Sequence, residues 1–141
     1  MLAILNLAWE AAQLPFYTIW QQGTWREIGF AVAHCTAGDV LIGLFSAGAA
    51  LLLTGRRWPR EAWSRLIFTG YIIAFGLTYT VFSEWLNVAV RKSWAYSALM
   101  PVIPPLDTGL APLLQWIVVP MLASWLTHRR KALDGIPPRR R

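Results

Sequence analysis

Four long apolar stretches, separated by polar, basic or proline-rich segments, dominate the chain. They run from about Leu2 to Trp20, Ile28 to Leu53, Leu66 to Val90 and Leu110 to Thr127. As helices, each would be roughly 27 Å long or more, close to the hydrocarbon thickness of a bilayer. The pattern predicts an all-α polytopic membrane protein with four transmembrane helices. Pro15 is expected to kink the first of them.

The segment from Arg91 to Pro112 departs from this pattern. Its proline density forbids a continuous helix, because proline lacks the backbone N–H that the helix needs. Irregular backbone at membrane depth must be covered by protein. We therefore expect a Pro-rich interfacial loop between helices 3 and 4. Its prolines are Pro101, Pro104, Pro105 and Pro112.

Composition and charge support a membrane setting. Hydrophobic residues make up 56% of the chain and charged residues only 14%, against about 25% charged residues in soluble domains. Of the thirteen Lys and Arg residues, four lie in Arg56–Arg65 and six in Arg129–Arg141. With four helices, both segments and the N-terminus share one side, which the positive-inside rule makes cytoplasmic. The prediction is N-in/C-in, with a transmembrane domain over 1–128 and a basic cytoplasmic tail over 129–141.

Other features exclude whole classes of protein. A net charge of +6 held in short connectors and a short tail does not indicate nucleic-acid binding; such a tail attracts anionic lipids. The single cysteine, Cys35, excludes an internal disulfide and a Cys-x-x-Cys metal motif. The N-terminal stretch has no basic region and contains Glu10 and Gln13, so we expect a retained helix and not a cleaved signal peptide.

Three acidic residues lie inside predicted helices: Glu10, Asp39 and Glu84. A charge at mid-membrane costs at least ~2.5 kcal/mol, so each must face protein or water, be paired, or be protonated. Polar residues follow these acids at helical spacing of three or four. On helix 1 they are Asn6, Gln13 and Tyr17; on helix 3, Thr80, Asn87 and Arg91; on helix 2, Cys35 and Thr36.

Their depths place these polar residues together in the outer half of the membrane, below the Pro-rich loop. We predict a cavity there in which Glu10 or Asp39 donates a proton and Glu84 or His34 accepts one. Trp94, Tyr96 and Met100 are expected to close its mouth. The expected substrate-binding residues are Gln13, Tyr17, Asn87, Trp94, Tyr96, Met100 and Gln115.

Several motifs resemble those of a group of small four-helix bacterial membrane proteins to which no activity is attached. They are Ala33-His-Cys-Thr-Ala-Gly-Asp-Val-Leu-Ile42, Ser83-Glu-Trp-Leu-Asn87, Trp94-Ala-Tyr96 and Met100-Pro101. The resemblance covers most of Leu2 to Ser124 and implies the bacterial inner membrane. In layout alone, the chain is similar to sterol isomerases of the emopamil-binding type and to lycopene cyclases, and no residue role is carried over from them.

Three functions remain open from the sequence. The first is an enzyme performing isomerisation, hydration or cyclisation on an apolar, lipid or isoprenoid-like substrate by acid–base chemistry. The second is a metal or haem site using His34 and the carboxylates, although no His-x-x-His or Glu-x-x-His spacing occurs. The third is a transport, proton-relay or assembly subunit, acting as a homo-oligomer or with a membrane-protein partner. The sequence specifies no cofactor.

Overall fold

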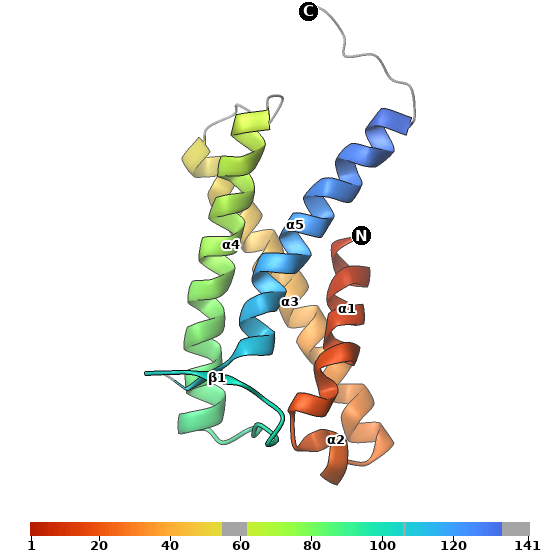
Figure 1. Cartoon of the computed structure of the whole chain (residues 1–141), viewed down its shortest axis with the longest axis vertical. Coiled ribbons are helices and arrows are strands. Elements are labelled where there is room, and N and C mark those ends of the chain that lie inside the picture. The colour runs from red at the N-terminus through yellow and green to blue at the C-terminus, as the bar shows by residue number, and fades with distance from the viewer. Residues whose placement is uncertain (55–61, 106, 134–141) are drawn as a thin grey trace, which may run out of the picture.

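The computed structural model describes residues 1–54, 62–105 and 107–133 and is mostly helical (Figure 1). Within them, three helices are long and apolar enough to cross a membrane: Trp25–Thr54, Trp63–Val90 and Leu110–Arg129. They correspond to α3 (Trp25–Thr54), α4 (Ala62–Glu84) with its continuation η2 (Trp85–Val90), and α5 (Leu110–Leu133). Such spans are typical of a membrane protein.

The first apolar stretch is not one helix, and the prediction of a continuous helix from Leu2 to Trp20 is wrong. α1 covers Leu2–Gln13, followed by a 3₁₀ turn η1 (Leu14–Phe16) and a short α2 (Ile19–Gln22). Pro15 lies at the start of the 3₁₀ turn, and Tyr17 then adopts an extended backbone. At 1.5 Å per residue, α1 is only about 18 Å long, so it does not match the length of a full membrane span.

The second helix begins three residues earlier than expected because of a capping box. Thr24 donates its backbone N–H and its hydroxyl to the Glu27 carboxylate, both at 2.8 Å. The Glu27 N–H donates back to the Thr24 hydroxyl at 3.3 Å. This reciprocal pairing satisfies N–H groups that the first turn of a helix leaves without partners. α3 therefore starts at Trp25.

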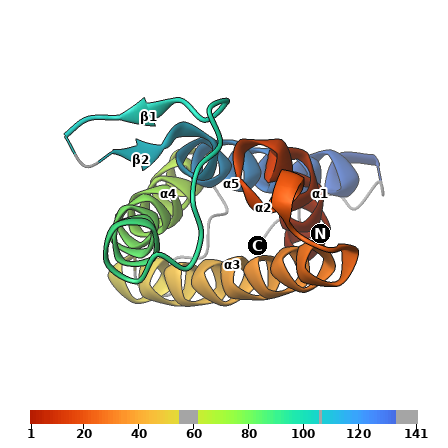
Figure 2. The ribbon, with the colours of Figure 1, turned by 90° about the horizontal axis from the view of Figure 1, so that it is seen from below.

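The four main helices pack as a closed ring. α3 contacts α1 and α4, and α5 lies between α4 and α1 (Figure 2). Two glycines permit this packing: a Cβ at Gly43 would lie 2.8 Å from the Leu2 side chain, and one at Gly76 would lie 2.0 Å from the Trp116 ring.

The Pro-rich segment is irregular, as expected, but it also contains a hairpin that the sequence did not indicate. Strands β1 (Val102–Ile103) and β2 (Thr108–Gly109) pair antiparallel. Asp107 has a positive φ of 48°, which suits the turn before β2. The hairpin projects sideways at one end of the bundle (Figures 1 and 2). It leads directly into α5 at Leu110.

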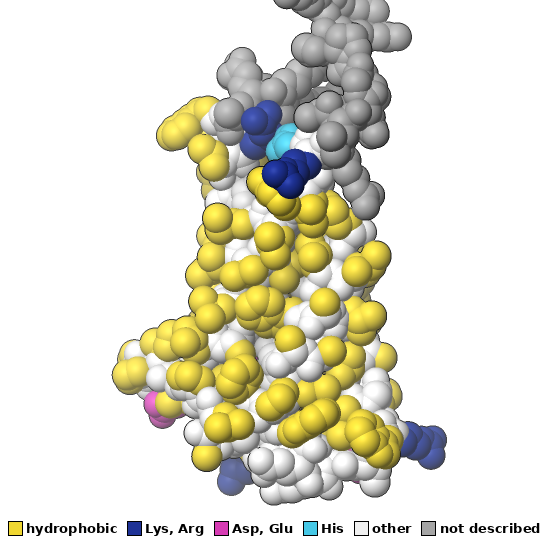
Figure 3. Space-filling view, turned by 45° about the vertical axis from the view of Figure 1, so that its right-hand side comes forward, with side chains coloured by type: hydrophobic (Ala, Val, Ile, Leu, Met, Phe, Trp, Pro, Cys, Tyr) yellow, Lys and Arg dark blue, Asp and Glu magenta, His cyan; other side chains and the backbone are white. Residues whose placement is uncertain are grey.

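The distribution of polar and apolar side chains between interior and surface is the reverse of that in a soluble protein. The buried polar residues are Asn6, Glu10, Gln13, Ser46, Thr80, Glu84, Thr108 and Gln115. Large apolar side chains instead cover the outside: Phe45, Leu52 and Trp25 are 77%, 85% and 83% exposed. Figure 3 shows the apolar surface along the bundle, with Lys and Arg side chains at both ends and a His side chain at the end away from the hairpin. A polar interior within an apolar exterior fits a lipid surrounding.

Parts of the predicted topology fall outside the described residues. These are most of the basic connector Arg56–Arg65 and the end of the basic tail, 134–141. The helix expected to end at Thr127 continues to Leu133, so the first residues of the predicted tail are helical.

Candidate functional site

A cavity of about 360 Å³ lies inside the ring, towards the end that carries the hairpin. Its lining includes Glu10, Gln13 and Tyr17 from the first segment, and His34 and Asp39 from α3. The other predicted site residues in the lining are Glu84, Asn87, Trp94 and Gln115. All three acids that the sequence placed inside predicted transmembrane helices therefore face the same space. Of the residues expected at the site, only Tyr96 and Met100 are absent from its lining.

The floor of the cavity is a network of amides and carboxyls from α1, α3 and α5. Gln115 donates from Nε2 to Asp39 Oδ2 at 2.6 Å and to Asn6 Oδ1 at 3.1 Å. Gln13 donates from Nε2 to Glu10 Oε1 at 2.7 Å. The carboxyl groups of Glu10 and Asp39 lie close enough to interact directly. One amide thus ties three helices together around a pair of acids.

Glu84 enters the cavity at a local change of helix type. It is the last residue of α4, and the following turn, Trp85–Val90, is a π-helix closed by the Arg91 N–H donating to the Leu86 carbonyl at 2.7 Å. Such turns recur at functional sites, because the extra residue re-aims neighbouring side chains. Asn87 donates to the Ser83 carbonyl at 2.9 Å, so one of its amide hydrogens is already satisfied within the helix.

Tyr96 connects the Glu84 carboxylate to the hairpin. Its hydroxyl donates to Glu84 and accepts the Gly109 N–H at 2.9 Å. The sulfur of Met100 would lie 3.0 Å from a Cβ at Gly109, so buried Met100 packs beneath the hairpin instead of lining the cavity. Tyr96 and Met100 therefore do not line the cavity, and they contact Glu84 and the hairpin beside it.

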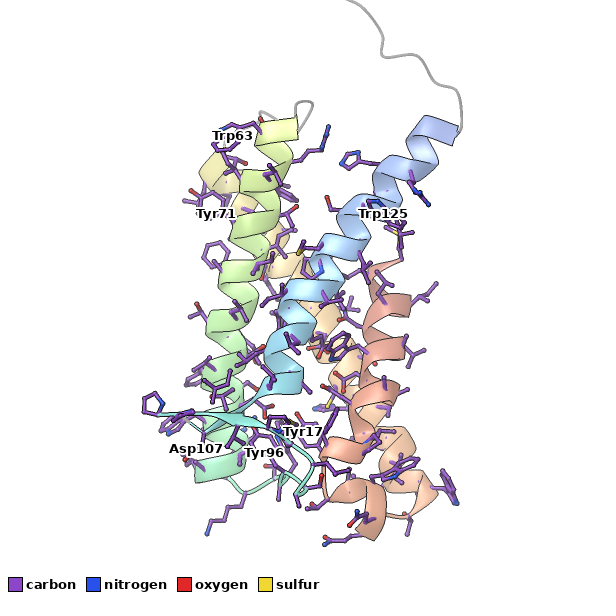
Figure 4. All side chains as sticks on the ribbon, in the orientation of Figure 1. Tyr17, Trp63, Tyr71, Tyr96, Asp107 and Trp125 are labelled. Carbon is purple, nitrogen blue, oxygen red and sulfur yellow. The ribbon has the colours of Figure 1, made fainter. Side chains whose placement is uncertain are left out.

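Two distant segments, residues 16–18 and 95–97, pair beside the cavity and form what we call the lid. Tyr17 forms an antiparallel bridge with Tyr96, and their rings lie 5.7 Å apart (Figure 4). The Thr18 N–H donates to the Ala95 carbonyl at 3.0 Å, and the Ser97 N–H donates to the Phe16 carbonyl at 2.8 Å. The break after α1 thus provides the extended backbone that this lid needs.

Both tyrosines of the lid are held in the neutral form. Burial, followed by the charge of Glu84, raises the pKa of Tyr17 well above its usual value. Burial, followed by the hydrogen bond to Glu84, raises the pKa of Tyr96 in the same direction. Each hydroxyl therefore remains a hydrogen-bond donor across the physiological range.

His34 is more exposed to solvent than Glu10, Asp39 and Glu84. It belongs to the cavity lining but is exposed, and its ring stacks on Phe30 at a centroid distance of 5.5 Å. It therefore lies at the rim, away from the Glu10–Asp39 pair. Across residues 1–54, 62–105 and 107–133, no group of three or more His, Cys, Asp and Glu side chains is arranged to hold a metal ion.

Two polar atoms of the cavity lining have no hydrogen-bond partner. They are Oε1 of Gln13, a residue only 6% exposed, and Nε1 of Trp94, which faces Glu84 without reaching hydrogen-bond geometry. Buried polar atoms are nearly always satisfied, so such exceptions call for an explanation. One acceptor and one donor are thus available to a bound group.

Two contributors were not among the predicted site residues. Asn6 was placed on the polar stripe with Glu10, but its contact with Gln115 on α5 was not predicted. Trp116 lines the cavity and is 4% exposed, but nothing in its local pattern distinguished it from an interfacial tryptophan.

Comparison with known proteins returned no match: no protein family, no curated protein and no solved structure is significantly similar to this chain.

Proposed function

We propose that the chain is an integral membrane enzyme that performs acid–base chemistry on an apolar or lipid-like substrate. The observation that carries the proposal is the meeting of Glu10, Asp39 and Glu84 in one cavity inside a bundle whose exterior is apolar. Polar groups gathered in this way are expensive in a membrane and mark functional sites. The reaction class is isomerisation, hydration or cyclisation.

The acids divide into two roles. The Glu10–Asp39 pair serves as the donor, because a carboxylic acid beside a carboxylate makes a donor–acceptor pair. Glu84, fixed by the Tyr96 hydroxyl, serves as the acceptor. In an isomerisation, the pair protonates one carbon of a double bond, and Glu84 removes a proton from a neighbouring carbon. The faces of Trp94 and Tyr17 stabilise the cationic intermediate.

The membrane setting proposed with this function is the bacterial inner membrane, with both termini in the cytoplasm. The end carrying Arg65 and Arg129 would face the cytoplasm, and the hairpin would face the periplasm. α1 would then form a short fourth membrane helix. Reporter fusions after Leu133 and within the hairpin test this orientation, and a periplasmic signal from the fusion after Leu133 contradicts it.

The chemical proposal is tested by lipid mass spectrometry of cells with and without the gene, complemented by single variants. Glu10→Gln, Asp39→Asn and Glu84→Gln should each reproduce the lipid profile of the deletion, because each removes a proton-transfer group at nearly constant shape. Asp107→Asn is the matched control, since Asp107 is exposed in the hairpin turn. If all three variants restore the wild-type profile, acid–base catalysis is wrong, and a transport or assembly role is favoured.

A further inference from the structure

A second cavity, of about 470 Å³, lies beyond the first along the bundle. Its lining is mostly apolar and includes Gly43, Ala47, Phe68, Ile72, Pro120 and Ala123. Trp116 belongs to the lining of both cavities. We call the two spaces the polar cavity and the apolar crevice. The Trp116 indole is the wall that they share.

The two spaces follow the same three helices in successive turns. On α3, the polar cavity takes Asp39 and Ile42, and the apolar crevice takes Gly43 and Ala47. On α5, the lining continues from Gln115 through Trp116 to His128, a rise of about 20 Å. A long molecule aligned with the helices would pass from one space into the other beside Trp116.

The side chains of the polar cavity determine which head group of a long ligand it can bind. Three carboxyl groups disfavour an anionic head such as a phosphate. The unpartnered Gln13 Oε1 needs a donor, and the unpartnered Trp94 Nε1–H needs an acceptor. A hydroxyl both donates and accepts, so one group can bind both atoms, whereas an ammonium group has donors only and can bind Gln13 alone.

We propose that the ligand is an uncharged long-chain lipid alcohol, with its hydroxyl between Gln13 and Trp94 and its hydrocarbon chain in the apolar crevice. This assignment rests on the proposed function, because it names the substrate class of the same site. It makes Gln13 a head-group ligand and makes the lining of the crevice a determinant of chain length.

The test is binding of radiolabelled hexadecanol to the full chain purified in detergent, measured by scintillation proximity. Hexanol, hexadecylamine and hexadecyl phosphate serve as competitors. We expect hexadecanol to bind at least tenfold more tightly than the other three. Gln13→Leu should weaken hexadecanol binding about tenfold, since a hydrogen bond to a buried group is lost. Tighter binding of the amine or the phosphate overturns the assignment of the head group.

Substitutions that fill the apolar crevice test whether the hydrocarbon chain of the ligand lies there. Ala47→Phe should weaken hexadecanol binding about tenfold and leave hexanol unchanged. Ala37→Phe, on an exposed position of the same helix, is the matched control. Ala123→Phe fills the crevice from α5 should the first variant fail to fold. Hexadecanol binding that is unaffected by either filled crevice overturns the proposal.

These experiments can refute the proposed chemistry and the proposed ligand independently of each other. If the crevice variants weaken binding but the carboxyl variants leave the lipid profile normal, the ligand assignment stands and the chemistry is wrong. If the carboxyl variants change the profile but neither Gln13→Leu nor Ala47→Phe affects binding, the chemistry stands and the ligand assignment is wrong.

Discussion

Gly76→Ala tests the packing on which the wall between the two spaces depends. A Cβ at Gly76 would lie 2.0 Å from Cε3 and 2.3 Å from Cδ2 of Trp116. Carbon atoms in contact are about 3.5 Å apart or more, so the indole or α4 must move by about 1.5 Å. Trp116 is 4% exposed, so its ring is packed inside the bundle.

We expect this substitution to lower the free energy of unfolding by about 1–3 kcal/mol, the usual range for overpacking a close-packed interior. The assay is reversible denaturant unfolding of the full chain in mixed micelles. Gly70→Ala is the matched control on the same helix. A Cβ there meets nothing within 4 Å, so the change should be neutral or stabilising by up to about 1 kcal/mol through helix propensity.

The double variant Gly76→Ala with Trp116→Phe identifies the cause. If the clash with the indole is responsible, the smaller ring relieves it and the two effects are less than additive. Equal stability of the Gly76→Ala and Gly70→Ala variants would refute the close approach of α4 and α5 at this level, and with it the shared wall.

The remaining predictions concern the lid and the floor of the polar cavity. Tyr96→Phe should cost about 1–3 kcal/mol in denaturant unfolding, because Glu84 and the Gly109 N–H both lose a partner; Tyr71→Phe, a more exposed tyrosine, should cost little. Burial and Glu84 raise the pKa of Tyr96, so the neutral hydroxyl contributes stability that is present below the ordinary value of about 10 and is lost as pH rises above it. Thermal unfolding across that range should show this loss in wild type and a smaller one in Tyr96→Phe. Gln115→Leu should destabilise the chain by about 1–3 kcal/mol in the same micelle assay, since it leaves Asp39 and Asn6 without their shared donor; no loss of stability would show that the amide does not join the helices.

The long helices and the Pro-rich loop were predictable because their signals are local. Apolar length determines α3, α4 and α5, and a cluster of prolines excludes a helix whatever surrounds it. The first helix shows the limit of this reasoning. Pro15 alone is compatible with a kink, and what turns the kink into a break is the pairing of Tyr17 with Tyr96. That pairing joins positions far apart in the chain and leaves no mark in the local pattern.

The features of the site likewise divide into those that local patterns predict and those that depend on distant contacts. Helical spacing placed Gln13 with Glu10, and depth gathered Glu10, Asp39 and Glu84 towards the outer half of the membrane, so a common cavity could be predicted from periodicity and topology. The contact of Tyr96 with Glu84 depends on how the loop folds. The position of Trp116 depends on a glycine in another helix. The assigned roles of the acids and of His34 as donors or acceptors remain predictions.

The closed lid and the apolar crevice together bear on how a substrate could reach the acids. Backbone pairing between residues 16–18 and 95–97 holds the lid against the cavity at the hairpin end. An apolar molecule need not enter past the lid, because it dissolves in the bilayer that would surround the bundle. Entry between helices into the crevice would deliver the polar end last, past Trp116, to the unpartnered atoms of Gln13 and Trp94. An apolar approach to fixed acids would suit the carbocation chemistry proposed above, in which water must be kept from the intermediate.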